Sequence, residues 1–185
     1  MALFSKAELL RVQVFETGAF KKSAEGQTFD IFLAHSYDDG NLIKQLKQAV
    51  EGMGYSAYVD WINDQELDRS KVTKENAALL RKRLQQCKCL FFVTSVNSPK
   101  SIWMPWELGY FDAFKNRVAI LPLTEQPTGS DSYVEQEYLG LYPYVTKGRS
   151  DKDNKDTLWI HETASKYVIF RQWIEGKELV EHPVR

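Results

Sequence analysis

Hydrophobic residues fall into dense runs that alternate with longer, periodic stretches. The dense runs lie at residues 29–36, 89–95 and 117–123, with a shorter one at 55–59. Runs that are apolar on both faces of an extended chain predict buried strands of a parallel sheet. In residues 41–55, in 72–86 and in the latter part of 98–116, apolar residues recur with the period of an α-helix, which predicts helices there.

The order of these elements predicts the architecture. Strands and helices alternate along the chain, which predicts right-handed crossovers and a parallel sheet with helices on both faces. An extended run at residues 142–145 is the candidate for a fifth strand. Ligands of such sheets bind outside the carboxyl ends of the strands. We therefore expect a site among the polar stretches that follow the first three strands, at 34–39, 59–64 and 94–99.

The two ends of the chain carry predictions of their own. Apolar residues in 3–15 have nearly helical spacing, and Ser5 with Glu8 resembles a capping box, so we expect a short amphipathic helix followed by a linker. Residues 157–176 are partly periodic and predict a closing helix. We expect an N-terminal extension and linker at 1–26, one domain at 27–175 and a tail at 176–185.

Charge and cysteine content narrow the choice of partners and compartment. The chain has 24 Lys and Arg against 25 Asp and Glu, and a net charge of -1 gives no support to a nucleic-acid or membrane-surface partner. No apolar run is long enough to span a membrane, and no signal segment is present. Cys87 and Cys89 are too close for an ordinary disulfide and have no zinc-binding neighbours. These features indicate a cytoplasmic protein with free thiols.

Several kinds of chemistry are disfavoured by the motifs. The dinucleotide, P-loop, zinc-helix and nucleophile-elbow patterns are absent. His35 and Ser36 are adjacent, so on a strand they would point to opposite faces and pair poorly. Asp38 and Asp39 could hold Mg²⁺ in a phosphorylated receiver-like domain. That domain also needs an acceptor Asp after the third strand, where the chain reads VTSVNS. We expect Asp38 or Asp39 to cap the first helix instead.

One acid stands among aromatic residues. Glu107 lies in SIWMPWELGYF, residues 101–111, and proline at 105 predicts that the helix begins near Met104 or Pro105. Two interpretations remain open. Glu107 is either a partly exposed acid that interacts favourably with the helix dipole, or the centre of a pocket for a planar, cationic heterocycle.

Two segments resemble the conserved boxes of the Toll/interleukin-1 receptor (TIR) domain. FDIFLAHSYDD at 29–39 is similar to the first box, and SIWMPWEL at 101–108 is similar to the box that contains Trp and Glu-Leu, with Met104 in place of the usual Cys. VAILPL resembles the strand that follows, and the resemblance extends over about 28–145. It implies a flavodoxin-like three-layer α/β fold with a central parallel sheet of about five strands. The Arg-Asp and Pro-Gly pairs of receptor loops are absent, so the chain looks most like stand-alone bacterial members.

The resemblance also implies an activity. Enzymatic TIR domains are NAD+ glycohydrolases or ADP-ribosyl cyclases, which cleave the nicotinamide–ribose bond to give nicotinamide and ADP-ribose or a cyclic isomer. It implies Glu107 as the catalytic residue, and the substrate-binding candidates are Trp103, His35, Ser36, Tyr37, Asp60 and Trp61. NAD+ is then the substrate, and no cofactor or metal is expected.

Partners are implied in the same way. The resemblance implies a homo-oligomer or filament formed through TIR–TIR contacts. Glu66, Arg69 and Lys71 are then candidate interface residues, and in an unpaired loop they are instead solvated charges. A separate effector would read the nucleotide product in antiphage defence. The alternative is a TIR scaffold without catalysis that acts by protein interaction.

Overall fold

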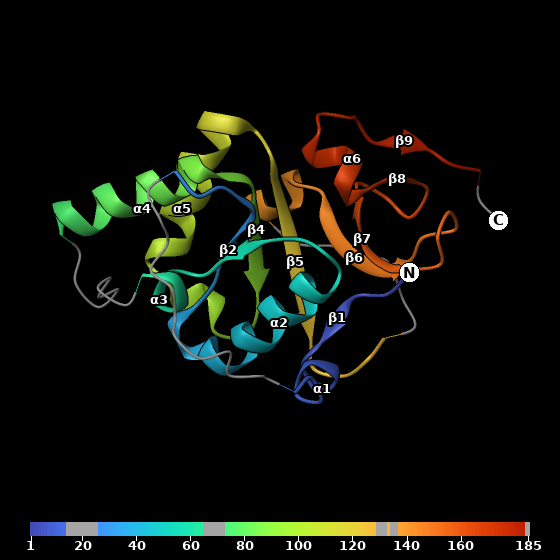
Figure 1. The fold of residues 1–185 in the computed structure, drawn as a ribbon, viewed down its shortest axis with the longest axis horizontal. Coiled ribbons are helices and arrows are strands. Elements are labelled where there is room, and N and C mark those ends of the chain that lie inside the picture. The colour runs from blue at the N-terminus through green and yellow to red at the C-terminus, as the bar shows by residue number, and fades with distance from the viewer. Residues whose placement is uncertain (14–25, 65–72, 129–132, 134–136, 184–185) are drawn as a thin grey trace.

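A computed structural model describes residues 1–13, 26–64, 73–128, 133 and 137–183. Its centre is a set of parallel strands, in the order β3, β2, β4, β5, β6 (Figure 1). Their bounds are β2 Phe29–Ala34, β3 Ala57–Tyr58, β4 Cys87–Thr94, β5 Val118–Thr124 and β6 Tyr144–Arg149. The expected parallel sheet of about five strands is therefore confirmed.

Helices cover both faces of this sheet. One face packs against α2 (Gly40–Gly52) and the C-terminal α6 (Phe170–Ile174), and the other against α4 (Lys74–Gln86) and α5 (Trp103–Lys115). The central strands are apolar on both faces because both faces are buried. In β4, for example, Phe91 packs in the core beneath α2, and Phe92 packs in the core beneath α5. Burial on both faces is typical of parallel sheets between helical layers.

The closing helix predicted at 157–176 is wrong. These residues form two antiparallel strands, β7 (Asp156–His161) and β8 (Lys166–Ile169), before the short α6. β9 (Val180–Glu181) pairs with β8, so the sheet continues through the predicted tail. The segment is rich in β-branched and aromatic residues, which favour strands, and its partial periodicity was too weak to specify a helix. The charged residues before it form a hairpin, in which Asn154 adopts a positive φ of 55°.

The first residues of the chain are part of the sheet. Only α1 (Lys6–Leu9) is helical, and its capping box is as expected, since the Ser5 Oγ accepts the Glu8 N–H at 3.3 Å and donates to its carboxylate at 2.7 Å. β1 (Phe4–Ser5) pairs with the end of β5, while Ala2 exchanges two 2.8 Å backbone hydrogen bonds with Lys147 of β6. β1 thus lies between the later parts of β5 and β6, beyond Ile120 and Tyr144, where those two strands pair directly (Figure 1). A domain boundary near residue 26 stays a prediction.

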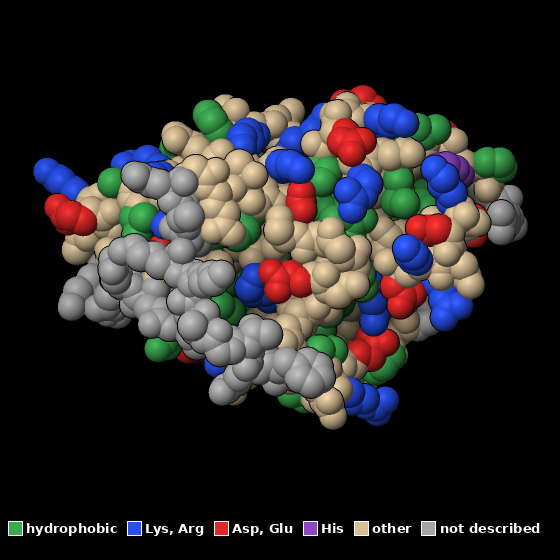
Figure 2. All heavy atoms as spheres, viewed as in Figure 1, with side chains coloured by type: hydrophobic (Ala, Val, Ile, Leu, Met, Phe, Trp, Pro, Cys, Tyr) green, Lys and Arg blue, Asp and Glu red, His purple; other side chains and the backbone are tan. Residues whose placement is uncertain are grey.

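The cysteines and the surface are ordinary. Cys87 and Cys89 are buried and not disulfide-bonded, and burial raises the pKa of both thiols. Figure 2 shows acidic and basic side chains interspersed over the face that carries α2. Among the described residues, no helix is long and apolar enough to cross a membrane.

Candidate active site

Helix α5 begins one residue earlier than the first position predicted. Trp103 is its first residue, and the Ser101 hydroxyl accepts the Met104 N–H at 3.3 Å. Pro105 therefore lies within the first turn, where the absence of an N–H costs no helical hydrogen bond. Glu107 follows at the start of the second turn, on the face that packs against the sheet.

Glu107 is fully buried, at 0% exposure. Its neighbours on the helix, Met104, Leu108 and Phe111, belong to a core that also contains Phe32 of β2. The interpretation of Glu107 as a partly exposed capping acid is therefore wrong. Burying a carboxylate costs free energy that its interactions must offset, and such positions are candidates for function.

The two tryptophans next to Glu107 have different surroundings. Trp103 is only 6% exposed and belongs to the same core as Met104. Trp106 meets it edge to face, with centroids 5.5 Å apart, then stacks on Tyr110 and carries the Arg81 guanidinium over its ring. Trp106 is thus occupied by packing between α5 and α4, as its position on another helix face predicts. We refer to Glu107 and Trp103 as the Glu107 group.

A second group forms where β2 and β3 end. His35 is buried, and its Nδ1 lies 2.8 Å from the Leu33 carbonyl oxygen, while its Nε2 lies 3.0 Å from the Trp61 Nε1. A carbonyl only accepts and an indole N–H only donates. Both bonds therefore form in the neutral tautomer that carries its proton on Nδ1.

The short helix α3 (Asp60–Asn63) holds the other members of this group. Asp60 is buried, and its Oδ1 accepts the Trp61 backbone N–H at 2.8 Å and lies 3.8 Å from the His35 Nε2. The Trp61 ring lies under the Lys44 ammonium at 5.2 Å. We refer to His35, Asp60 and Trp61 as the Trp61 group. The structure brings its members together as the strand order predicts.

The two groups occupy opposite faces of the sheet. Trp61 packs against the core beneath α2, whereas Trp103 belongs to the core beneath α5. Between them runs the segment after β2, where Ser36 is buried and Tyr37 is 75% exposed. The candidate residues therefore meet only at the carboxyl edge. Glu66, Arg69 and Lys71 lie outside the described residues.

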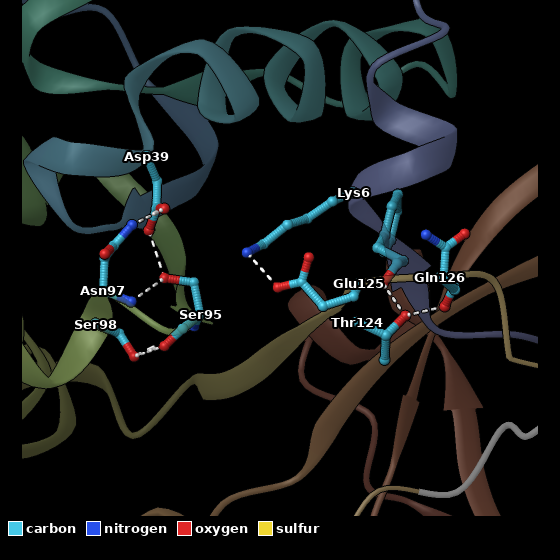
Figure 3. Close-up of polar contacts among 9 residues, drawn as sticks. Lys6, Asp39, Ser95, Asn97, Ser98, Thr124, Glu125 and Gln126 are labelled. Atoms are coloured by element: carbon cyan, nitrogen blue, oxygen red, sulfur yellow. Dashed lines mark hydrogen bonds and ion pairs between the residues drawn. The ribbon is translucent and has the colours of Figure 1, made fainter.

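Sequence reasoning placed the polar stretches 34–39 and 94–99 at this edge but missed the hydrogen bonds that join them. Of the two acids expected to cap the first helix, Asp39 occupies the N-cap position of α2, but its side chain makes no cap hydrogen bond. Its carboxylate instead accepts hydrogen bonds from Ser95 and from Asn97. Figure 3 shows Asp39 with Ser95, Asn97 and Ser98. The polar stretch after β4 signals a loop, but not its partner across the sheet.

The N-terminal segment reaches the same edge of the sheet. The Lys6 Nζ lies 2.6 Å from a Glu125 carboxylate oxygen, just beyond β5, and the Thr124 hydroxyl donates to the Phe4 carbonyl at 3.1 Å (Figure 3). Among the described residues, no group of three His, Cys, Asp or Glu side chains is arranged to hold a metal ion.

Comparison with known proteins identifies the family, although no family model matches. The chain is 54% identical over 157 residues to a Bacillus cereus (strain MSX-D12) protein named "Probable 3' cyclic ADP-D-ribose synthase ThsB'", a match that covers 85% of this chain and 81% of the relative. It is 32% identical over 104 residues to the "Putative cyclic ADP-D-ribose synthase TIR2" of Cytobacillus dafuensis, covering 56% of this chain and 27% of that protein.

Among solved structures, the TIR domain of the Toll-related receptor TRR-2 from Hydra magnipapillata matches 60% of this chain and 77% of that domain, with a TM-score of 0.42 and 17% identity. The identity and coverage of the Bacillus cereus relative decide the assignment. The chain belongs to the bacterial TIR-domain family of ThsB'.

Proposed function

We propose that this protein cleaves NAD+ at the nicotinamide–ribose bond and converts the ADP-ribose half into a cyclic isomer. The observation that carries the proposal is the fully buried Glu107 at the carboxyl edge of the sheet. The name of the Bacillus cereus relative, a cyclic ADP-D-ribose synthase, supports the same reaction.

Glu107 acts on the charge that develops at the ribose. Nicotinamide is already cationic in NAD+, so it leaves with the bonding electron pair and needs no proton. The ribose then becomes oxocarbenium-like, and a carboxylate beside it stabilises that charge. Because water is excluded around Glu107, the attraction is stronger than at a surface. One carboxylate therefore suffices for the cleavage step.

Trp103 shapes what happens after cleavage. Its ring, four positions before the acid and nearly buried, offers a flat surface on which the adenine or a ribose can stack. Stacking holds the adenosine half folded back toward the ribose, so that one of its own atoms attacks instead of water. Attack by water would give linear ADP-ribose.

The remaining candidates bind the substrate from the other side of the edge. Tyr37 is exposed and Trp61 is half-buried, so both present ring surface to a ligand, with Ser36 between the two groups. His35 and Asp60 affect substrate binding indirectly, because their hydrogen bonds hold Trp61 in place. A homo-oligomer would complete the site, and a separate effector would detect the product in antiphage defence.

The test is nicotinamide release by the purified protein at concentrations that permit assembly, with mass analysis of the other product. We expect a cyclic isomer from the wild type and no release from Glu107→Gln. Glu178→Gln is the matched control, because Glu178 is an exposed acid with a side chain 82% accessible. Absence of release from the wild type would contradict the enzyme assignment, and full activity in Glu107→Gln would contradict the assignment of the acid.

A further inference from the structure

Asp39 is a buried acid that the proposed reaction does not use. It is 4% exposed and directly precedes α2, yet its side chain makes no hydrogen bond to that helix. One carboxylate oxygen accepts the Ser95 hydroxyl and the other accepts the Asn97 amide at 2.8 Å. These donors lie 56 and 58 residues further along the chain, so Asp39 joins the segment after β2 to the loop after β4.

The loop after β4 is itself tightly hydrogen-bonded. The Ser95 hydroxyl accepts the Asn97 N–H at 3.0 Å, and the Ser98 hydroxyl donates to the Ser95 carbonyl at 2.9 Å. The 3-10 turn at Ser98–Lys100 follows, and the Ser101 N–H donates to the Ser98 carbonyl at 3.1 Å. A shift of this loop at Asp39 is therefore passed along its hydrogen bonds to the residues that precede α5.

The same chain of bonds reaches α5. The Ser101 hydroxyl accepts the Met104 N–H in the first turn of that helix, directly beside Trp103. The hydrogen-bonded path from Asp39 thus ends at the turn that precedes Glu107. Through it, the position of the Glu107 group relative to Ser36 and Tyr37 depends on one carboxylate.

The charge of Asp39 is stabilised where it stands. A buried carboxylate is costly unless it is hydrogen-bonded, and here two neutral donors and the positive end of the α2 dipole offset that cost. A carboxylate holds both donors at once because both of its oxygens accept. An amide in its place has one accepting oxygen for Asn97 and can only donate its N–H to the Ser95 hydroxyl, so two bonds to a charged acceptor are replaced by weaker neutral ones.

We propose that Asp39 is a positioning residue that sets the partition between cyclisation and hydrolysis. This rests on the proposed function. In both routes the nicotinamide–ribose bond breaks and its electron pair leaves with nicotinamide. In cyclisation, an oxygen or nitrogen of the adenosine half bonds to the anomeric carbon and releases its proton, if it has one, to solvent. In hydrolysis, a water oxygen bonds to the anomeric carbon and releases a proton to solvent.

The two routes differ in the geometry that they need. Water reaches the anomeric carbon from many directions, whereas the adenosine half must be folded back with its attacking atom aligned. A displacement of about 1 Å can cost an oriented reaction on the order of 100-fold in rate. A loosened loop therefore lowers cyclisation more than it lowers cleavage.

The experiment compares Asp39→Asn with the wild type by the ratio of cyclic to linear product. We expect the ratio to fall by about 10-fold or more, with a smaller loss of nicotinamide release. Every folded molecule contributes to both products, so a lower folded fraction leaves the ratio unchanged. Asp38→Asn is the matched control, because Asp38 is the exposed acid next to Asp39 in the same turn.

Ser95→Ala and Asn97→Ala test the same link from the donor side, and they keep the proposal falsifiable if Asp39→Asn does not fold. Both should lower the ratio. An unchanged ratio in all folded variants, or a wild type that forms only linear ADP-ribose, overturns the inference while leaving NAD+ cleavage intact. A wild type that releases no nicotinamide overturns the proposed function, and the inference with it.

Discussion

The Glu107 group and the Trp61 group lie at the same edge of the sheet but in different packing surroundings. In the Trp61 group, the polar atoms satisfy one another, since His35 accepts the indole N–H of Trp61 and Asp60 accepts its backbone N–H. In the Glu107 group, a carboxylate lies among apolar neighbours. Under the proposed function, the first arrangement holds a loop in place, and the second supplies a carboxylate to the positive charge that develops on the ribose. The comparison separates positioning from chemistry.

The Glu107→Gln substitution tests the difference between the two groups with the largest expected effect. We expect nicotinamide release to fall by about 1,000-fold or more, because the amide carries no charge to stabilise the oxocarbenium ion. The free energy of unfolding should change by less than about 1.5 kcal/mol, because the amide has nearly the same volume as the carboxylate. Urea denaturation beside the activity assay measures both. A loss of activity that merely tracked a loss of stability would make Glu107 structural.

The next largest expected effect is a loss of stability when the buried ion pair that follows α3 is broken. At the end of α3, the buried Asp64 receives two 2.6 Å hydrogen bonds from Arg83 and one of 2.8 Å from the Tyr58 hydroxyl. Arg83→Met leaves that carboxylate without its cation, so we expect a loss of about 3–5 kcal/mol in urea denaturation. The exposed Arg81→Met should cost less than about 1 kcal/mol. Similar losses in both would mean that the buried pair has no special role.

Within the Trp61 group, His35→Ala and Trp61→Phe remove the two sides of one hydrogen bond. We expect either variant to raise KM for NAD+ several-fold with a smaller change in kcat, because the ring of Trp61 binds rather than reacts. The loss in stability from Trp61→Phe should be about 1–2 kcal/mol, as His35 keeps a buried acceptor without its donor. If kcat fell and KM did not change, the Trp61 group would belong to the chemistry instead.

The smallest effect concerns Asp30, near the start of β2 and away from both groups. Burial works to raise the pKa of its carboxyl, but hydrogen bonds from Lys88 and Ser56 outweigh burial and hold the pKa below 3.8. Its stabilisation is therefore present above about pH 4 and is lost as the pH falls further. Asp30→Asn should lose less stability than the wild type between pH 6 and pH 3 in urea denaturation, with wild-type activity at neutral pH.

Much of the fold follows from local pattern. The dense apolar runs specified the central strands because each is buried on both faces, and the helical periods specified α2, α4 and α5. The region after residue 156 could not be predicted in the same way. Its strands are short, and β7 pairs with both β6 and β8, so their stability comes from cross-strand pairs that the propensity of a single segment does not show.

The site divides along the same line. Glu107 and Trp103 could be proposed because a short segment holds both, and His35 and Trp61 because strand order brings their ends to one edge. The partners of Asp39 could not be found. Capping its own helix is the usual role of an acid at that position, and nothing local indicates that Ser95 and Asn97 compete for it.

The place of β1 has a consequence for how the molecule folds. Thr124 and Phe4, which its pairing brings together, are 120 positions apart. The later parts of β5 and β6, which β1 joins, are therefore bridged only after a very long loop has been ordered. Contacts of such separation form slowly. Until they form, the backbone groups of two hydrophobic strands remain available to other chains. Aggregation during refolding should therefore depend on the first five residues more than their small number suggests.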